Sequence, residues 1–395
     1  MSQTKAQLID AAATFTISSD ASFNSVSIGK GANSVSTNTV VGETALDAIT
    51  SGSANTAFGF SSLTALTSGT ENTAIGQRSL LSLVTGHRNT GVGGGTLQNT
   101  TGNDNTAVGR DSLIQNTSGT GNTAVGKDAL NKNTTANNNT AIGSVCLDAN
   151  TTGTGNVSVG AFSMTDNTTG DNNTVVGESA LGNNTTASDN TAIGKNALVQ
   201  NTTGADNVAV GAFALDANTT ASENVAVGKD ALTDNTTGTS NTAVGRMALG
   251  NNTTADGNTG IGTDALFTNT TGAQNTSVGH NSMFENTTGG HNVAVGSFAL
   301  DANTEGSSNT AVGVSALGAN TTGTVNTAVG RQALQENTTG SYNQAFGYLT
   351  LQNNTTGQRN VGLGYSCLRN NTTGGDSVGI GYSTLNAQTT GNNNI

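Results

Sequence analysis

The sequence contains no proline among its 395 residues, although average usage of about 5% would give roughly 20. Because proline has no N–H to donate, it is excluded wherever backbone donors belong to a continuous ladder. Tryptophan is also absent, and only 33% of the residues are hydrophobic and 4% aromatic. The length would allow about two or three ordinary domains. This composition argues against such compact domains and favours sheet along most of the chain.

Positive charge and long apolar runs are scarce as well. The net charge is −12, and the few Lys and Arg residues are scattered, so we expect no nucleic acid and no anionic membrane as a partner. No apolar run approaches the roughly 20 residues that cross a bilayer. The opening "MSQTKAQLIDAAATFTISS" lacks the apolar stretch of a signal peptide. We therefore expect no membrane insertion, synthesis in a cytoplasm, and delivery by assembly or lysis.

A repeat occupies most of the chain. The phrase Asn-Thr-Ala-Val-Gly and its variants end in a glycine 21 times between Gly42 and Gly381, 17 residues apart except for one 16-residue interval. That interval runs from Gly93 to Gly109, where "GGGTLQN" is one residue short. A constant period is typical of a solenoid or fibre, whose units bury their faces against their neighbours. Numbered from its Asn, the repeat is N-T-A-V-G-x-x-A-L-x-x-N-T-T-G-x-x.

The pattern within each repeat predicts the fold class. Alternation around positions 2 and 4 has the two-residue period of a strand, and the polar, glycine-rich positions 15 to 17 indicate a turn. We predict an all-β parallel β-solenoid or β-roll of about 21 coils with a 17-residue period. Each coil would hold two or three short strands, and coils stacked about 4.8 Å apart would form a rod on the order of 100 Å long. Residues 1–24 would form an attachment segment and residues 25–395 the repeat shaft.

Fixed positions in the repeat predict the core. We expect the residues at positions 4 and 9, with the apolar residues at position 12 of the first three coils, to stack as internal ridges. The predicted core residues are Val108, Leu113, Val125, Leu130, Ile142, Leu147, Val244, Leu249, Ile49, Leu66 and Leu83. Asparagines at positions 1 and 12 would form ladders of side-chain hydrogen bonds, namely Asn105, Asn122 and Asn139, and Asn116, Asn133 and Asn150.

The position-12 asparagines also begin N-glycosylation sequons. Acceptors in every coil would lie only about 4.8 Å apart, too close for a bulky sugar on each one. Ile49, Leu66 and Leu83 occupy the same position in the first coils. An inward-facing Asn ladder is therefore favoured over glycan acceptors.

Other chemistry-bearing residues do not assemble a nucleophile, a base and an oxyanion donor. We predict that the chain is not an enzyme and has no catalytic residues, no cofactor and no metal site. The two cysteines share position 8 thirteen coils apart, too far for a disulfide, so we interpret them as small buried residues. The "GGG" at Gly93 is interpreted as a corner. Isolated surface histidines and a solvated carboxylate column are expected at His87, His280 and His291, and at Asp148, Asp216 and Asp301.

The repeat phrases resemble those of a known family. "NSVSIGKGANSVSTNTVVG" (Asn24 to Gly42) and the later "NTAVG" and "NVAVG" phrases resemble the head repeats of trimeric autotransporter adhesins. The resemblance implies a left-handed parallel β-roll in which three chains form one rod. The period here is longer than in that family, and no translocator domain is recognisable.

The opening "MSQTKAQLID" resembles the start of tail fibre proteins of marine tailed phages, whose shafts often use N-T-A-x-G repeats. That resemblance implies an N-terminus attached to another virion protein and a self-cleaving C-terminal chaperone, and "TTGNNNI" ends inside a repeat as a processed fibre would. We expect a homotrimeric tail fibre in the virion that binds a host cell-surface receptor, with a glycan as one candidate. The alternatives are a bacterial trimeric surface adhesin and an ice-binding β-solenoid with Thr rows at positions 2, 13 and 14.

Overall fold

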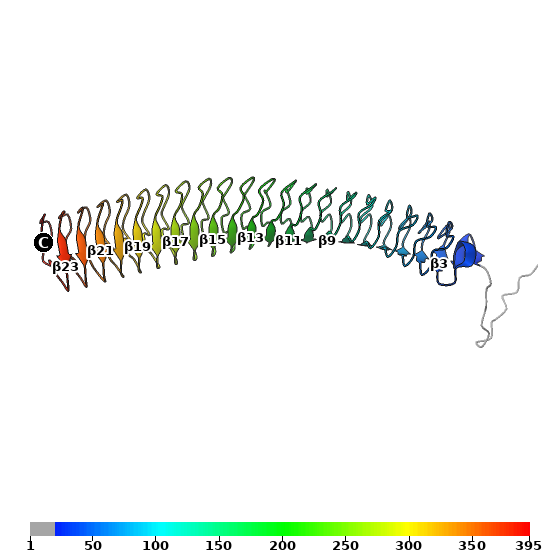
Figure 1. Cartoon of the computed structure of the whole chain (residues 1–395), viewed down its shortest axis with the longest axis horizontal. Coiled ribbons are helices and arrows are strands. Elements are labelled where there is room, and N and C mark those ends of the chain that lie inside the picture. Colours follow the sequence, from blue (N-terminus) through cyan, green and yellow to red (C-terminus); the bar gives the residue numbers. More distant parts are fainter. Residues whose placement is uncertain (1–19) are drawn as a thin grey trace, which may run out of the picture. The chain divides into compact units, whose positions relative to one another are not determined.

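The computed structural model describes residues 20–395, which form two compact units. The first unit ends at Asp128, and the second runs from Ala129 to Ile395. Each unit is a stack of flattened coils with one short strand per 17-residue turn (Figure 1). The predicted all-β parallel β-solenoid with a 17-residue period is confirmed, with about 20 turns in the described residues. Each turn contributes one strand and not the two or three that we expected, because its other residues form turns.

The elements of the first unit are β1 (Ala21–Phe23), β2 (Val26–Gly29), the 3-10 helix η1 (Ala32–Ser34), β3 (Thr39–Gly42), β4 (Thr56–Phe58), β5 (Thr73–Ile75), β6 (Thr90–Val92), β7 (Thr106–Val108) and β8 (Thr123–Val125). Those of the second unit are β9 (Thr140–Ile142), β10 (Val157–Val159), β11 (Thr174–Val176), β12 (Thr191–Ile193), β13 (Val208–Val210), β14 (Val225–Val227), β15 (Thr242–Val244), β16 (Thr259–Ile261), β17 (Thr276–Val278), β18 (Val293–Val295), β19 (Thr310–Val312), β20 (Thr327–Val329), β21 (Gln344–Phe346), β22 (Val361–Leu363) and β23 (Val378–Ile380).

The register of the sheet places residues of the same repeat position beside one another in neighbouring turns. In the second unit each strand pairs in parallel with the next, as where Ala192 of β12 lies beside Ala209 of β13. The strands from β3 to β8 follow the same rule in the first unit, as where Ala57 lies beside Ala74. Because the strands pair in register, across the 16-residue repeat as well, each position on the strands forms a continuous column of like residues within a unit.

The first unit begins with antiparallel strands. Strand β2 pairs antiparallel with both β1 and β3, and the Asp20 carboxylate accepts the N–H groups of Lys30 and Gly31 at 2.7 and 2.8 Å. Gly29 and Gly42 are 13 residues apart, and this shorter spacing coincides with the antiparallel pairing of β2 with β3. Residues 1–19 of the predicted attachment segment lie outside the described residues, and β1 falls within its remainder, so that boundary stays a prediction.

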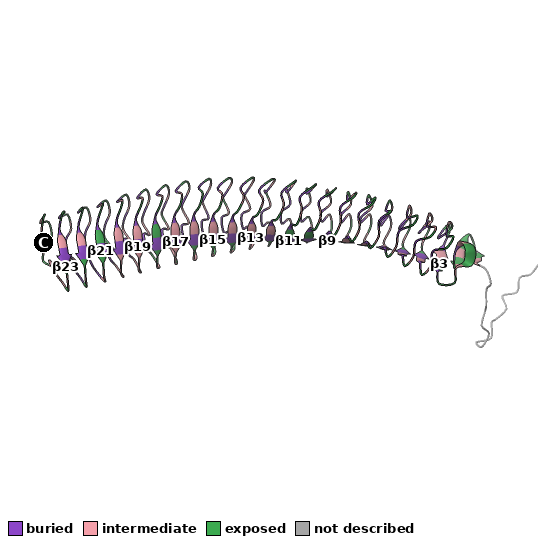
Figure 2. Ribbon diagram, viewed as in Figure 1, coloured by how far each residue is buried: buried purple, intermediate pink, exposed green. Residues whose placement is uncertain are grey.

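The interior of the coils is built from positions 1, 3, 8, 9 and 12. The Leu prediction at position 9 is confirmed, as is the apolar position 12 of the first coils. Each of these side chains is fully buried: Leu113, Leu130, Leu147, Leu249, Ile49, Leu66 and Leu83. The residues beside the position-9 Leu are small, mostly Ala at positions 3 and 8. Figure 2 shows the resulting mixture of buried and exposed residues along each turn.

The prediction that position 4 lies in the core is wrong. Val108 and Val125 are half-buried, and Ile142 and Val244 are 41% and 36% exposed. Side chains alternate across a strand, so a buried Asn at position 1 and Ala at position 3 turn positions 2 and 4 outward. The space against position 3 is already filled, since a Cβ added at Gly260 would lie 3.2 Å from Cγ of Leu249.

The glycine that closes each phrase is required by the fold. All the glycines at position 5 have φ between +120° and +154°, a region that other residues rarely adopt. A Cβ at Gly211 would also lie 2.3 Å from the carbonyl oxygen of Gly228 in the next turn. Positive φ and close approach together exclude any side chain there.

The 16-residue repeat keeps every inward position. Thr100 stands where other repeats have the position-12 Asn, and its hydroxyl oxygen accepts from Nδ2 of Asn116 at 2.9 Å. The Thr101 hydroxyl donates to the Thr117 carbonyl oxygen, as the position-13 Thr does in other turns. The Gly102 carbonyl oxygen accepts from Nδ2 of Asn89, as the position-15 Gly does in other turns. The missing residue is therefore the outward position 14, and not part of "GGGTLQN" as expected.

Candidate functional site

The two predicted Asn ladders lie inside the coils. At position 1, the Asn122 backbone N–H donates to Oδ1 of Asn105 at 3.0 Å, and Asn156 donates to Oδ1 of Asn139 at 2.9 Å. At position 12, Nδ2 of Asn150 donates to Oδ1 of Asn133 at 3.1 Å. The side chains of Asn105, Asn122, Asn139, Asn116, Asn133 and Asn150 are fully buried. The ladders are confirmed and are structural.

Burial of the position-12 asparagines bears directly on the sequons. Nδ2 of Asn150, the atom that would carry a glycan, donates to Asn133 and to the Gly153 carbonyl at 3.0 Å. A glycan there would have to break both contacts and leave the coil interior. The prediction that this position faces inward is confirmed.

The outward face of the strands is a candidate interaction surface. In the second unit, position 4 places a branched aliphatic or aromatic side chain on this face in every turn. Position 2 places Thr or Val beside it in nearly every turn. The position-4 side chains that are 36–64% exposed are Ile142, Val176, Ile193, Val227, Val244, Ile261, Val295, Phe346, Leu363 and Ile380. Because strands pair in register, these side chains form an apolar stripe along the unit.

Aromatic residues gather at one end of the second unit. All four tyrosines of the chain lie between residues 342 and 382. Tyr348, Tyr365 and Tyr382 share position 6 of successive turns, with ring centroids 5.4 and 5.1 Å apart. The Arg331 guanidinium lies 5.9 Å from the centroid of the Tyr348 ring. The Tyr365 and Tyr382 rings are stacked, whereas the Tyr348 and Tyr365 rings are tilted by 38°. Tyr365 and Tyr382 are exposed.

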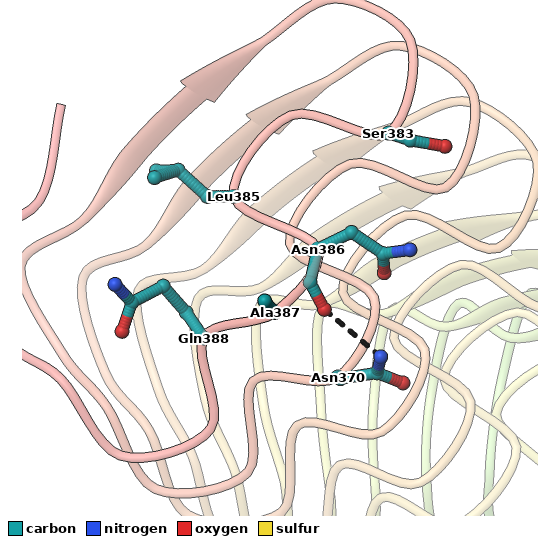
Figure 3. A pocket seen from close by; sticks show the side chains of 6 residues that line it. All are labelled: Asn370, Ser383, Leu385, Asn386, Ala387 and Gln388. Atoms are coloured by element: carbon teal, nitrogen blue, oxygen red, sulfur yellow. Dashed lines mark hydrogen bonds between the residues drawn. The ribbon is translucent and has the colours of Figure 1, made fainter.

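A polar cavity of about 570 Å³ lies beside the last turn of the second unit. It is lined by Asn370, Ser383, Leu385, Asn386, Ala387 and Gln388 (Figure 3). Nδ2 of Asn370 donates to the Asn386 carbonyl oxygen at 2.9 Å, while Oδ1 of Asn386 is buried without a partner. The lining offers amide and hydroxyl groups for hydrogen bonds but brings no base close to a nucleophile.

The cysteines are buried and unpaired as predicted. Sγ of Cys146 lies 3.2 Å from Oγ of Ser163, and burial raises the pKa of both the Cys146 and Cys367 thiols. A raised pKa keeps the thiol protonated and weakly nucleophilic. These residues pack the interior at position 8.

The histidines stand apart from one another. His280 and His291 are exposed, and His87 is half-buried with Nδ1 3.1 Å from the Thr70 backbone nitrogen. Within residues 20–395, no group of three or more His, Cys, Asp or Glu side chains could hold a metal ion.

The position-10 carboxylates differ from the expected solvated column. Burial raises the pKa of both Asp216 and Asp301, and both residues are half-buried. The Thr233 hydroxyl donates to Asp216 at 2.6 Å, and Nζ of Lys132 lies 3.6 Å from Asp148. The neighbouring turns cover this column because they stack so closely.

Most of the Lys and Arg side chains in the repeats pair with a carboxylate. Arg88 with Asp104 and Arg359 with Asp376 form two-point contacts, with Nε to Oδ1 distances of 2.5 and 2.6 Å. Hydrogen bonding to its Arg lowers the pKa of each aspartate. Exposed pairs of this kind contribute little to stability.

Comparison with known proteins does not assign a family. No protein-family model matches the chain, and no curated protein matches it. None of the helices in residues 20–395 is long and apolar enough to cross a membrane. The candidate site therefore rests on the chain's own geometry. The sequence indicates two apolar rows, at positions 4 and 9, but did not identify position 4 as the row that faces outward. A small residue at position 3 next to a buried Asn at position 1 was the pattern that could have indicated it.

Proposed function

We propose that the chain forms the shaft of a homotrimeric virion fibre, the tail fibre of a tailed bacteriophage, and takes part in host attachment. The observation that carries the proposal is the apolar stripe of the second unit, with position-4 side chains up to 64% exposed in the single chain. Contiguous exposed apolar surface marks an interaction site. In parallel copies the stripes would face one another in register, since each position recurs in every turn. Closed three-fold symmetry would give each copy the same partners.

The sparse interior of each turn also supports assembly. In most turns the only large side chain that is fully buried is the position-9 residue, such as Leu249 or Met283. Burying one Leu or Val contributes about 1.5–3 kcal/mol, whereas ordering the backbone costs about 1–2 kcal/mol per residue. Covering position 4 between copies would add a second apolar side chain per turn. A trimer therefore stabilises a fold that a single chain stabilises poorly.

A pair of charge substitutions tests the trimer. Val227→Asp with Val244→Asp places two carboxylates per chain in the stripe, so we expect the trimer to dissociate or fail to form. Thr237→Asp with Thr254→Asp is the matched control, because both residues are exposed at position 14 of the same turns. Analytical ultracentrifugation should show a trimer for the control alone. Trimers of equal stability in both variants would contradict the role of the stripe.

Immunogold electron microscopy tests the fibre assignment. Antibody raised against the purified chain should label fibres on phage particles from a lysate. Label confined to the surface of the producing bacterium would contradict the phage role and favour the alternative, a trimeric surface adhesin. Fluorescently labelled protein should also bind host cells, and the host-cell receptor is the partner that this proposal requires.

The N-terminal segment is proposed to join another virion protein, because "MSQTKAQLID" resembles the start of phage tail fibre proteins. Deleting residues 1–19 should leave the repeats folded but remove the fibre from particles. Circular dichroism checks the fold, and electron microscopy counts the fibres. Particles with a normal fibre number would contradict this assignment.

The outward Thr residues favour ice binding as a second candidate. Position 2 carries Thr on the exposed strand face, as at Thr242 and Thr259, and such rows can order water. Val157 and Val293 interrupt the row, and trimer formation would cover it. Thermal hysteresis in the purified protein would support this candidate over the fibre.

A further inference from the structure

One turn of the first unit lacks side chains where every other turn carries them. Positions 6 and 7 are both glycine only at Gly94 and Gly95, and elsewhere they hold residues such as Phe60 or Arg110. The gap forms a recess of about 450 Å³ lined by Gln77, Arg78, Gly94, Gly95, Gln98, Arg110 and Asp111. The recess is independent of the fibre role proposed above.

The fold does not require glycine at position 94. Its backbone has no positive φ, and an added Cβ would meet only the Gln77 carbonyl oxygen, at 3.9 Å. The backbone here is fixed by the Gly95 N–H, which donates to the Gln77 carbonyl at 3.0 Å. The Asp111 N–H donates likewise to the Gly94 carbonyl at 3.0 Å. The glycine therefore leaves an open space that a large side chain at this position would enter.

The Arg78 side chain borders this space without a partner. Most Lys and Arg residues of the repeats pair with a carboxylate, as Arg110 does with Asp111 at 2.9 Å. The side chain of Arg78 makes no hydrogen bond, ion pair or ring contact within residues 20–395, and it is exposed. The residue above it in its column is Gly95, which has no side chain to offer. An unpaired guanidinium beside an open recess is unusual in a chain with a net charge of −12.

We propose that this recess binds an oxyanion group carried by an acidic saccharide. Guanidinium groups bind carboxylate, sulfate and phosphate through paired N–H donors, and the Gln77 and Gln98 amides can donate to neighbouring hydroxyl oxygens. The volume of about 450 Å³ exceeds what a bare inorganic anion occupies and falls in the ~300–1,000 Å³ range of small-molecule pockets. The lining also holds the Asp111 carboxylate, which pairs with Arg110 at 2.9 Å and leaves the Arg78 charge for the ligand. A sugar unit with one acidic group therefore fits both the charge and the size.

Two variants of the full-length chain test the site without disturbing the fold. Gly94→Phe fills the recess with the residue found at the same position as Phe60. Arg78→Gln removes the guanidinium and keeps a residue that another turn accepts at Gln332. Arg246→Gln is the matched control, because it removes the same charge from an arginine that pairs with Asp264. Melting temperatures should agree for all four proteins, which confirms folding.

Isothermal titration calorimetry at low salt measures binding of trigalacturonate, inorganic phosphate and a neutral galactose trisaccharide. We expect trigalacturonate to bind and the neutral sugar not to bind. Affinity should fall about tenfold or more in Gly94→Phe and Arg78→Gln, the loss of at least one charged hydrogen bond, and stay unchanged in Arg246→Gln. If inorganic phosphate binds and its affinity falls in the same two variants, the result also supports the oxyanion site and identifies a free ion as the ligand. Absence of binding by both anions, or equal binding by Gly94→Phe, would overturn the proposal.

Discussion

The backbone N–H of Asn275 donates to Oδ1 of Asn258, the residue at the same position one turn earlier, at 2.9 Å. Nδ2 of Asn258 in turn donates to the Gly272 carbonyl oxygen at 2.9 Å. One side chain thus satisfies a buried donor and a buried acceptor of its neighbours. The column of asparagines replaces part of the apolar core that the composition does not supply.

Asn258→Ala should destabilise the protein strongly. It leaves the Asn275 N–H and the Gly272 carbonyl without these contacts, and each buried unpaired group costs about 1–3 kcal/mol. Urea unfolding measures the free energy of unfolding. The control is Asn251→Ala, at a half-buried outward position of the same region, and equal stability of the two variants would contradict a structural ladder.

Leu66→Ala should lower the free energy of unfolding by about 2–5 kcal/mol, the cost of removing a buried Leu. Leu66 is fully buried at position 12, where later turns have Asn. Val84→Thr, at an exposed position 13 that is Thr in most turns, should change stability by less than about 0.5 kcal/mol. If Leu66→Ala is as stable as the wild type, position 12 does not face inward in these turns.

Gly211→Ala should prevent folding of the surrounding turns. Its φ is +141°, and the new Cβ would lie 2.3 Å from the Gly228 carbonyl oxygen. Gly204→Ala is the comparison. An added Cβ there would also lie close to a backbone carbonyl, 2.1 Å from that of Ala221, but Gly204 has no positive φ, and position 15 already holds Ala187 and Ala221 in neighbouring turns. The two variants therefore differ in whether the residue must adopt a positive φ. Circular dichroism and limited proteolysis should show damage in the first variant and a folded second one. Normal protease resistance of Gly211→Ala would refute the argument that the positive φ at position 5 requires glycine.

Asp301→Asn should stabilise the protein at pH 7, and the gain should vanish in acid. Burial raises the pKa of Asp301, nearby Glu285 raises it further, and His280 opposes them. The raised pKa means that the folded state disfavours the charged carboxylate. This cost is present above the folded pKa and is relieved as the pH falls below the unfolded value of about 3.9. Thermal melts at pH 7 and pH 3 check it; a gain of equal size at both would contradict the assignment.

The period and its buried columns could be predicted from the sequence, because the 17-residue repeat is nearly constant. Leu66 at an Asn position indicated correctly that position 12 faces inward. The side of the strand was harder to predict. Val244 is more hydrophobic than Ala243, which favours Val244 for the core, yet the thin coil has room only for Ala243 beside the Leu of position 9. Hydrophobicity alone did not account for the available space.

The recess at Gly94 and the half-burial of Asp301 could not be predicted from the residues of a single repeat. Both depend on which side chains stand above and below in neighbouring turns, and hence on the stacking register. The same register explains the missing residue near Thr101, because only an outward position can be lost without breaking a ladder.

Light scattering coupled to size-exclusion chromatography tests the central claim, that the outward apolar stripe holds three chains together. The chain has a mass of 39.1 kDa, and we expect one species of 117.3 kDa, the mass of three chains. A stable 39.1 kDa species that retains the β signal in circular dichroism would contradict it.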